Sequence, residues 1–260
     1  MDIQNKNNIF NLEENVAIIT NCDQKLCKAI AIGLAKNGVD IAIVSNKFGE
    51  MENIVEEVKS LGRRSKLFRC DVSSSSDVKN MVKEALNYFN HIDILINSNR
   101  VLKETLLVNI SDKEWDKNIS NNLNGVFFCC REVAKVMVKQ RKGRIINISS
   151  VLAHVGKSGF SNYCVNNAAI VNFGRALALE VGEFGITVNA LTLPVILNSG
   201  SAGTFIENGK EKLDINLDKI PLRKAGNFDD VVCTIIFLAS NASEMITGIC
   251  LNVDGGFLAH

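Results

Sequence analysis

The chain lacks the features of several large classes of protein. Its 260 residues contain no apolar run that approaches the roughly 18–20 residues of a membrane span. Lysine and arginine are spread along the whole length and the formal net charge is +1, so no basic stripe suggests a nucleic acid partner. The first residues, MDIQNKNNIFNLEEN, have neither the basic nor the apolar segment of a secretory signal. We therefore expect a cytoplasmic protein with neither membrane nor nucleic acid as a partner.

The chain also lacks a metal-binding or redox motif of the usual spacing. Its eight cysteines form no C-x-x-C pair, and its three histidines lie far from them in sequence. In a chain without an export signal, such cysteines are typically small core residues. We predict free thiols and no metal site, with Cys22 and Cys27 as the one pair to test for oxidation.

The chain does contain enough apolar material for one large domain. Hydrophobic residues make up 47% and charged residues 22%, which is ordinary for a globular protein of this length. Short continuous apolar runs alternate with longer helical periods, a pattern typical of βαβ units. We predict a single α/β domain over residues 1–260 with a Rossmann-like, doubly wound parallel sheet. Within it, residues 1–10 form a polar N-terminal arm and residues 193–221 are the least regular region.

The periodicities also give approximate bounds for the elements. Strands are expected at 15–20, 40–45, 65–70, 92–97, 143–149, 186–192 and 249–253. Helices are expected at 25–37, 50–61, 76–90, 115–139, 163–184 and 229–240, the fourth interrupted only at Asn124-Gly125. In an open sheet of this kind, the ligand crevice lies at the carboxyl ends of the strands.

Seven short motifs follow one another along the chain. They are the first strand with its helix, Cys70-Asp71-Val72, Asp93-Ile94-Leu95-Ile96-Asn97, Asn122-Leu123-x-Gly125, Ser150-x12-Tyr163, Val188-Asn189-Ala190 and Val253-Asp254-Gly255-Gly256. In this order, from about residue 10 to 260, the chain resembles the short-chain dehydrogenase/reductase family. Five pieces look like gluconate 5-dehydrogenases and 2-dehydro-3-deoxygluconate 5-dehydrogenases: FNLEENVAIIT, the Cys22-Asp23 pair, Leu61-Gly62-Arg63-Arg64, FLASNAS and DGGFLAH. Acyl-carrier-protein ketoreductases share much of the same framework.

The resemblance implies NAD(P)-dependent hydride transfer at a hydroxyl or keto group of a sugar acid. Tyr163 then exchanges the proton, Ser150 orients the substrate oxygen and Asn122 carries a water. The family has a lysine one helical turn after the tyrosine, where this chain has Asn167. A phenol with an ordinary pKa near 10 is a weak base at neutral pH and needs that cation. A cation about 4 Å away contributes about 4 kcal/mol at an effective dielectric constant of about 20, and asparagine does not supply it.

The same residues also admit structural roles. Ser150 can cap backbone groups at a strand end, as can Ser149 beside it. Tyr163 can pack as an ordinary helix tyrosine at the edge of the sheet. Asn122 has Asn121 next to it in a chain where asparagine is frequent, which weakens its assignment to a proton relay.

The resemblance further implies a dinucleotide site, where the chain departs from the family again. The family turn T-G-x-x-x-G-x-G corresponds to Thr20 followed by Asn21, Lys25 and Cys27 at the glycine positions. Each added Cβ takes space that phosphates or a left-handed backbone would use at the helix N-terminus. We expect Cys27 to obstruct most and Lys25 to attract phosphate. A plain strand-turn-helix that binds no dinucleotide is the alternative.

Residues at the adenosine side are partly retained. Asp71 and Val72 match positions that touch the adenine, and Asn97 begins the stretch that flanks adenosine. Asn99 and Arg100 replace small residues in that stretch, and Pro194-Val195 replaces a Pro-Gly. Lys47 after the second strand leaves NADP open beside NAD.

Three hypotheses follow from these departures. The first is an inactive or severely impaired family member, acting as a subunit partner or a small-molecule binder. The second is an active sugar-acid or 3-oxoacyl oxidoreductase with a variant site. The third is a subunit that completes a hetero-oligomer with an intact paralogue. By resemblance, a homodimer or homotetramer would form through the helices at 115–139 and 163–184, and residues 193–221 would cover the substrate.

Overall fold

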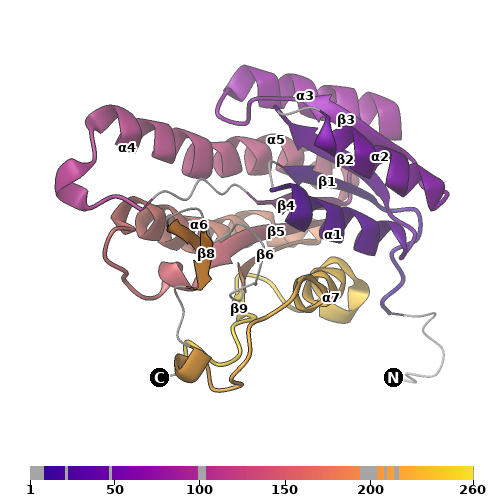
Figure 1. Ribbon diagram of the computed structural model, residues 1–260. Helices are drawn as coiled ribbons and strands as arrows, with labels where there is room; N and C mark the ends of the chain where they lie inside the picture. Colours follow the sequence, from indigo (N-terminus) through magenta and orange to yellow (C-terminus); the bar gives the residue numbers. More distant parts are fainter. Residues whose placement is uncertain are drawn as a thin grey trace.

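The computed structural model describes residues 9–20, 23–46, 49–98, 104–193, 204–207, 210–213 and 217–259. Its centre is a seven-stranded sheet in the order β3-β2-β1-β4-β5-β6-β9 (Figure 1). The strands are β1 (Val16–Thr20), β2 (Asp40–Ser45), β3 (Ser65–Arg69), β4 (Ile94–Asn97), β5 (Gly143–Ser150), β6 (Ile186–Leu193) and β9 (Cys250–Asn252). All neighbours in it are parallel, which confirms the predicted fold class.

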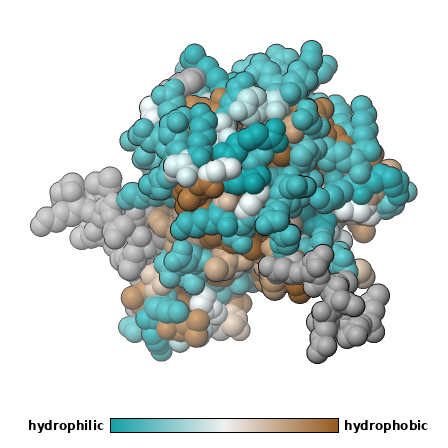
Figure 2. Space-filling view, turned by 90° about the vertical axis from the view of Figure 1, so that its right-hand side faces the viewer, coloured by the Kyte–Doolittle hydropathy of each residue, from teal (hydrophilic) through white to brown (hydrophobic). Residues whose placement is uncertain are grey.

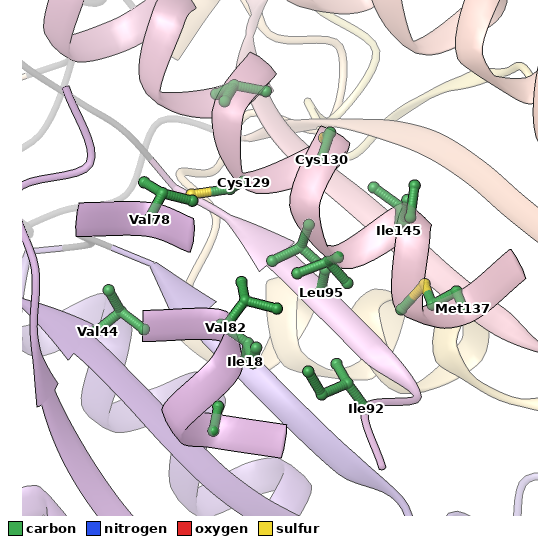
Figure 3. Close-up of a cluster of buried hydrophobic side chains, with 14 of the residues drawn as sticks. Ile18, Val44, Val78, Val82, Ile92, Leu95, Cys129, Cys130, Met137 and Ile145 are labelled. Carbon is green, nitrogen blue, oxygen red and sulfur yellow. The ribbon is translucent and has the colours of Figure 1, made fainter. Parts of the chain in front are cut away.

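Helices cover both faces of the sheet. The helices are α1 (Gln24–Ala35), α2 (Glu50–Ser60), α3 (Ser75–Phe89), α4 (Asp112–Ile119), α5 (Gly125–Gln140), α6 (Ser161–Val181) and α7 (Phe228–Ala239). One core cluster joins the sheet to α1, α2 and α7, and a second joins it to α3, α5 and α6. Figure 3 shows part of the second, where Val82 and Met137 of the helices surround Leu95 and Ile145 of the strands. Because both faces are covered, every residue of β1, β2, β4, β5 and β6 is buried.

The helix predicted at 115–139 is longer and differently interrupted. It begins at Asp112, because Ser111 caps α4 in a capping box with Glu114. A π-helical turn, Ser120–Asn124, joins α4 directly to α5. The predicted interruption at Asn124-Gly125 falls on the boundary between this π-helical turn and α5, and the chain stays helical there, since Gly125 has a right-handed helical φ of −59°. The irregularity itself extends over Ser120–Asn124 and contains the buried Asn122.

The region predicted to be least regular contains a hairpin. Strands β7 (Thr204–Glu207) and β8 (Lys210–Leu213) pair antiparallel. The apolar periodicity of the sequence did not predict these two strands. The remainder of the predicted lid over 193–221 lies mostly outside the described residues, as does the N-terminal arm up to residue 8.

Within the described ranges, no helix is both long and apolar enough to cross a bilayer, and no group of three or more histidine, cysteine or acidic residues is placed to hold a metal ion. The seven cysteines in those ranges are free thiols; Cys22 lies outside them.

Gly33 allows α1 and α7 to pack closely. A Cβ at this position would overlap the Cγ1 atom of Val232 on α7. We expect Gly33→Ala to lower the free energy of unfolding by about 1–3 kcal/mol in urea denaturation. The loss should appear although alanine favours a helix over glycine by about 1 kcal/mol.

The matched control is Gly182→Ala. Gly182 has a helical φ of −59° and nothing within 4 Å of the added Cβ, so its replacement should leave stability unchanged or slightly higher. Trimming the opposing side chain with Val232→Ala should recover part of the Gly33→Ala loss. Strictly additive losses in the double variant would show that the two positions do not clash.

Candidate active site

Three neighbouring strands carry polar side chains at the carboxyl edge of the sheet. The register places Thr20 of β1 beside Asn97 of β4, and Asn97 beside Asn147 of β5. Thr20 Oγ1 donates to Asn97 Oδ1 at 3.2 Å, and Asn97 Nδ2 donates to Asn147 Oδ1 at 2.8 Å. All three residues are fully buried. We call this set the polar ladder; it uses both ends of the Asn97 amide, which the sequence assigned to a cofactor.

Cys130 of α5 joins the polar ladder from the helix side. Its Sγ atom lies 3.2 Å from Asn97 Nδ2 and 3.6 Å from Asn147 Oδ1. Burial raises the pKa of the Cys130 thiol to about 12, against the opposing effect of the two asparagine hydrogen bonds. The group is therefore a neutral thiol at physiological pH and serves packing rather than nucleophilic chemistry.

Ser150 and Tyr163 are brought to the same edge but are not hydrogen-bonded to each other. Ser150 ends β5, and its Oγ accepts the backbone N–H of Leu152 at 3.3 Å, which caps the short helix Val151–Ala153. Tyr163 is 2% exposed and packs with Phe160 and Leu152. Its hydroxyl has no hydrogen-bond partner among the described residues. The serine thus has the capping role that the sequence left open as its alternative.

Asn167 is held by the protein on both sides of its amide. Its Nδ2 donates to the backbone carbonyl of Tyr163 at 2.8 Å, one helical turn earlier. Its Oδ1 accepts from Ser149 Oγ at 3.3 Å. Only 6% of Asn167 is exposed. At the position of the family lysine, the chain has a neutral group that ties α6 to β5.

Asn122 belongs to a network of asparagines between α4 and α6. It lies in the π-helical turn, is 2% exposed, and its Nδ2 donates to Asn118 Oδ1 at 3.1 Å. The same Asn118 oxygen accepts from Asn166 Nδ2 on α6. Asn166 Nδ2 also lies 2.9 Å from the carbonyl of Asn162. The sequence predicted Asn122 alone. The signal that could have found the network is the repeated i,i+4 spacing of asparagines, at 118/122 and at 162/166.

The turn after β1 is capped by the protein itself. Asp23 is the N-cap of α1, and its Oδ1 accepts the backbone N–H of Leu26 at 3.1 Å. Cys27, expected to obstruct a dinucleotide most, is 1% exposed and packs in the core; its effect on dinucleotide binding stays a prediction. A thiol is small enough to fill core space where the family has glycine. Asn21 lies outside the described residues.

Lys25 lies on the outer side of α1. With Lys28 it lines a groove of about 510 Å³ between α1 and α7, whose floor includes Phe228 and Val232. Lys28 is paired with Glu57 of α2 at 2.7 Å. Figure 2, seen from the side of α1, α2 and α7, shows a mostly hydrophilic surface with small hydrophobic patches.

At the adenosine side, the retained residues have local structural roles. Asp71 Oδ1 accepts from the backbone N–H and the hydroxyl of Ser73, at 2.9 and 2.7 Å. Val72 is 3% exposed and is part of the core on the α3 side. Asn99, Arg100, Lys47 and Pro194-Val195 lie outside the described residues.

Known proteins are similar to this chain over more than nine tenths of its length. The family described as enoyl-(acyl carrier protein) reductase matches residues 23–258. A 3-oxoacyl-[acyl-carrier-protein] reductase of Staphylococcus epidermidis is 33% identical over 92% of this chain and 97% of its own length. The enzyme of the same name from Synechocystis is 33% identical over 95% of this chain and 98% of its own length.

Solved structures of similar proteins superimpose on nearly the whole chain. A short-chain type dehydrogenase/reductase of Mycobacterium marinum superimposes with a TM-score of 0.87 at 25% identity, covering 97% of this chain and 98% of the other. An Agrobacterium tumefaciens protein, provisionally named a gluconate dehydrogenase, gives a TM-score of 0.88 at 26% identity, with 97% and 99% covered. Sequence motifs, sheet order and relatives lead to one conclusion: the chain belongs to the short-chain dehydrogenase/reductase family.

Proposed function

We propose that this chain is a noncatalytic member of its family that does not perform NAD(P)-dependent hydride transfer. The observation that carries the proposal is the position of Asn167. Both ends of its amide are bound within the protein, to Tyr163 O and Ser149 Oγ. No positive charge is supplied there to favour a phenolate, a contribution of about 4 kcal/mol at an effective dielectric constant of about 20.

The residues at the start of α1 do not fit a dinucleotide. A pyrophosphate binds at a helix N-terminus because free backbone N–H groups and the helix dipole favour an anion there. In this chain the Asp23 carboxylate takes the N–H of Leu26. A phosphate about 4 Å from that carboxylate would be repelled by about 4 kcal/mol at an effective dielectric constant of about 20. We therefore derive no reaction step through NAD or NADP.

The family residues that this chain retains form hydrogen bonds within the protein. Asn97 holds the polar ladder, Ser150 caps a helical turn and Asn122 binds Asn118. Glycines and lysine, which serve the ligand, are the residues that have been replaced. This division supports a protein in which the fold, rather than the reaction, is used.

Self-association is part of the proposal. Phe127 of α5 is 40% exposed and stacks edge-on against Phe173 of α6, and Val165 of α6 is 45% exposed. Apolar side chains on two adjacent helices favour burial against a further subunit. We propose a homodimer or homotetramer through this face; an intact paralogue in place of a second copy is the alternative.

A second candidate function is reduction of 3-oxoacyl thioesters. It is favoured by the relatives named 3-oxoacyl-[acyl-carrier-protein] reductase, which match over more than 90% of this chain. Oxidation of a sugar acid is supported by the short motifs of the sequence and by the name of the Agrobacterium structure. Both reactions would use the Tyr163 hydroxyl to exchange a proton.

Cofactor binding tests the proposal directly. In titration calorimetry, the wild-type protein should bind NADH and NADPH with a Kd weaker than about 1 mM, which corresponds to about −4 kcal/mol. The matched variant Asn21→Gly/Asp23→Ser/Lys25→Gly reopens the turn and should bind in the micromolar range. Cys27 stays in this variant because it is buried in the core. Micromolar binding by the wild type would remove the main support for a noncatalytic protein.

Asn167→Lys tests whether the family lysine can be restored. The change removes two hydrogen bonds and places an ammonium group where only 6% of the residue is exposed. We expect the free energy of unfolding to fall by about 2–4 kcal/mol, with no turnover of a 3-oxoacyl thioester and NADPH. Asn80→Lys, at an exposed position of α3 outside the proposed self-association face, is the control and should cost little. A rise in reduction rate for Asn167→Lys alone would favour the second candidate function.

Tyr163→Phe separates the two functions by stability as well as by rate. A buried hydroxyl without a partner costs about 1–3 kcal/mol, so its removal should leave the free energy of unfolding unchanged or raise it by about 1 kcal/mol. The only other tyrosine, Tyr88, is 41% exposed, and Tyr88→Phe should have no effect. Wild-type turnover that disappears in Tyr163→Phe, together with a loss of stability, would identify a working proton donor.

A further inference from the structure

Cys250 lies beside an imidazole and a hydroxyl at the last strand of the sheet. Its Sγ atom is 3.5 Å from His154 Nε2 and 3.1 Å from Thr192 Oγ1. Cys250 is the first residue of β9, and Thr192 belongs to the neighbouring strand β6 (Figure 1). His154 directly follows the short helix Val151–Ala153 at the end of β5. Three segments that are distant in sequence therefore bring a thiol, a hydroxyl and an imidazole together.

The other thiols that the structure describes differ from Cys250. Among the described residues, Cys250 is the one cysteine whose sulfur is at hydrogen-bond distance from an imidazole. Burial raises the pKa of Cys70 and of Cys130 to about 12, and Cys129 is fully buried. Cys233 of α7 is exposed, but no described histidine is hydrogen-bonded to it. Cys250 thus combines partial exposure with a neighbouring base, which is the environment typical of a reactive thiol.

The arrangement suits transfer of the thiol proton. When the His154 ring carries its proton on Nδ1, the Nε2 atom accepts the S–H of Cys250. The Thr192 hydroxyl then donates to the sulfur and stabilises the negative charge that develops there. Asn252 Oδ1 lies 4.0 Å from the sulfur, so the imidazole is the nearer acceptor. A nucleophile and a base within hydrogen-bond reach are the pair that activates a thiol.

The electrostatic surroundings make the base necessary. Burial raises the pKa of the Cys250 thiol, while the Thr192 hydrogen bond and the positive charge of Arg175 act in the opposite direction. The resting group is therefore a neutral thiol at physiological pH, and its proton has to leave during the reaction. His154 is exposed and Cys250 is partly exposed, so a small solute reaches both groups.

We propose that Cys250 is an oxidation site for small hydroperoxides, with His154 as the general base. The sulfur attacks the terminal oxygen of the peroxide while the thiol proton passes to His154 Nε2. The O–O bond breaks, and the departing oxygen takes that proton from the imidazolium. A thiol and ROOH thus give a sulfenic acid and ROH, with the sulfur oxidised and the peroxide reduced by two electrons. The site uses neither the turn after β1 nor Tyr163, so it goes beyond the proposed function and does not depend on it.

Trapping of the sulfenic acid at each site tests the proposal. The full-length wild-type protein is treated with hydrogen peroxide in the presence of dimedone, which labels sulfenic acids, and labelling is followed by mass spectrometry. Glu244 lies between Cys233 and Cys250, so digestion at glutamate separates their peptides. We expect Cys250 to be labelled about tenfold faster than Cys233 or more, although it is the less exposed thiol. Equal or slower labelling of Cys250 overturns the proposal.

A variant of the base tests the role of the imidazole. His154→Gln keeps a polar side chain but removes the base, and should slow labelling of Cys250 by about tenfold or more, since general-base catalysis contributes about 10²–10⁴-fold. His91→Gln is the control, because that imidazole lies 3.3 Å from Asp93 instead, and it should label like wild type. Wild-type labelling of Cys250 in His154→Gln overturns the assignment of the base. The comparison of Cys250 with Cys233 needs no variant, so it decides the proposal even where His154→Gln fails to fold.

Discussion

Burial of the sheet on both faces is the constraint on which the rest of the structure depends. A parallel sheet between two layers of helices leaves little water for polar groups at the strand ends, so they bind mostly to other protein groups. Thr20 and Asn97 do so through the polar ladder, and Asn147 does so with its Oδ1 only, since its Nδ2 has no partner among the described residues. Ser149 does so through Asn167. The region that would hold a reaction centre is thereby organised as a structural joint between strands and helices.

That constraint explains which family residues persist. Asn97, Asn122 and Ser150 bond to the protein itself, and removing Ser150 would leave the buried N–H of Leu152 without its acceptor. A glycine that leaves room for a phosphate stabilises only the complex with the ligand. The same holds for a lysine that favours the ionised form of a tyrosine. On the proposal that this chain binds no dinucleotide, such residues can change without cost to folding. Cys27 illustrates this, because its side chain fills core space where the family has none.

The sequence predicted the sheet well and the site only in part. Strands such as β5 and β6 are continuous apolar runs, so their positions follow from local pattern alone. The hairpin at 204–213 and the π-helical turn at 120–124 follow from backbone pairing, which apolar periodicity does not encode. The direction of Cys27 and the partners of Asn167 depend on how α1 and α6 sit on the sheet. These are tertiary facts that no spacing rule contains.

Two helix N-termini in this chain show opposite solutions to the same electrostatic problem. At α1, where the family binds an anionic cofactor, the Asp23 carboxylate supplies the anion from within the chain. At α6 no side chain caps the helix and its first turn has no acidic residue, so the backbone N–H groups before Cys164 have no acceptor within the helix. On our proposal that the chain binds no dinucleotide, the Asp23 carboxylate takes over at α1 part of the electrostatic role that an anionic cofactor has in the family.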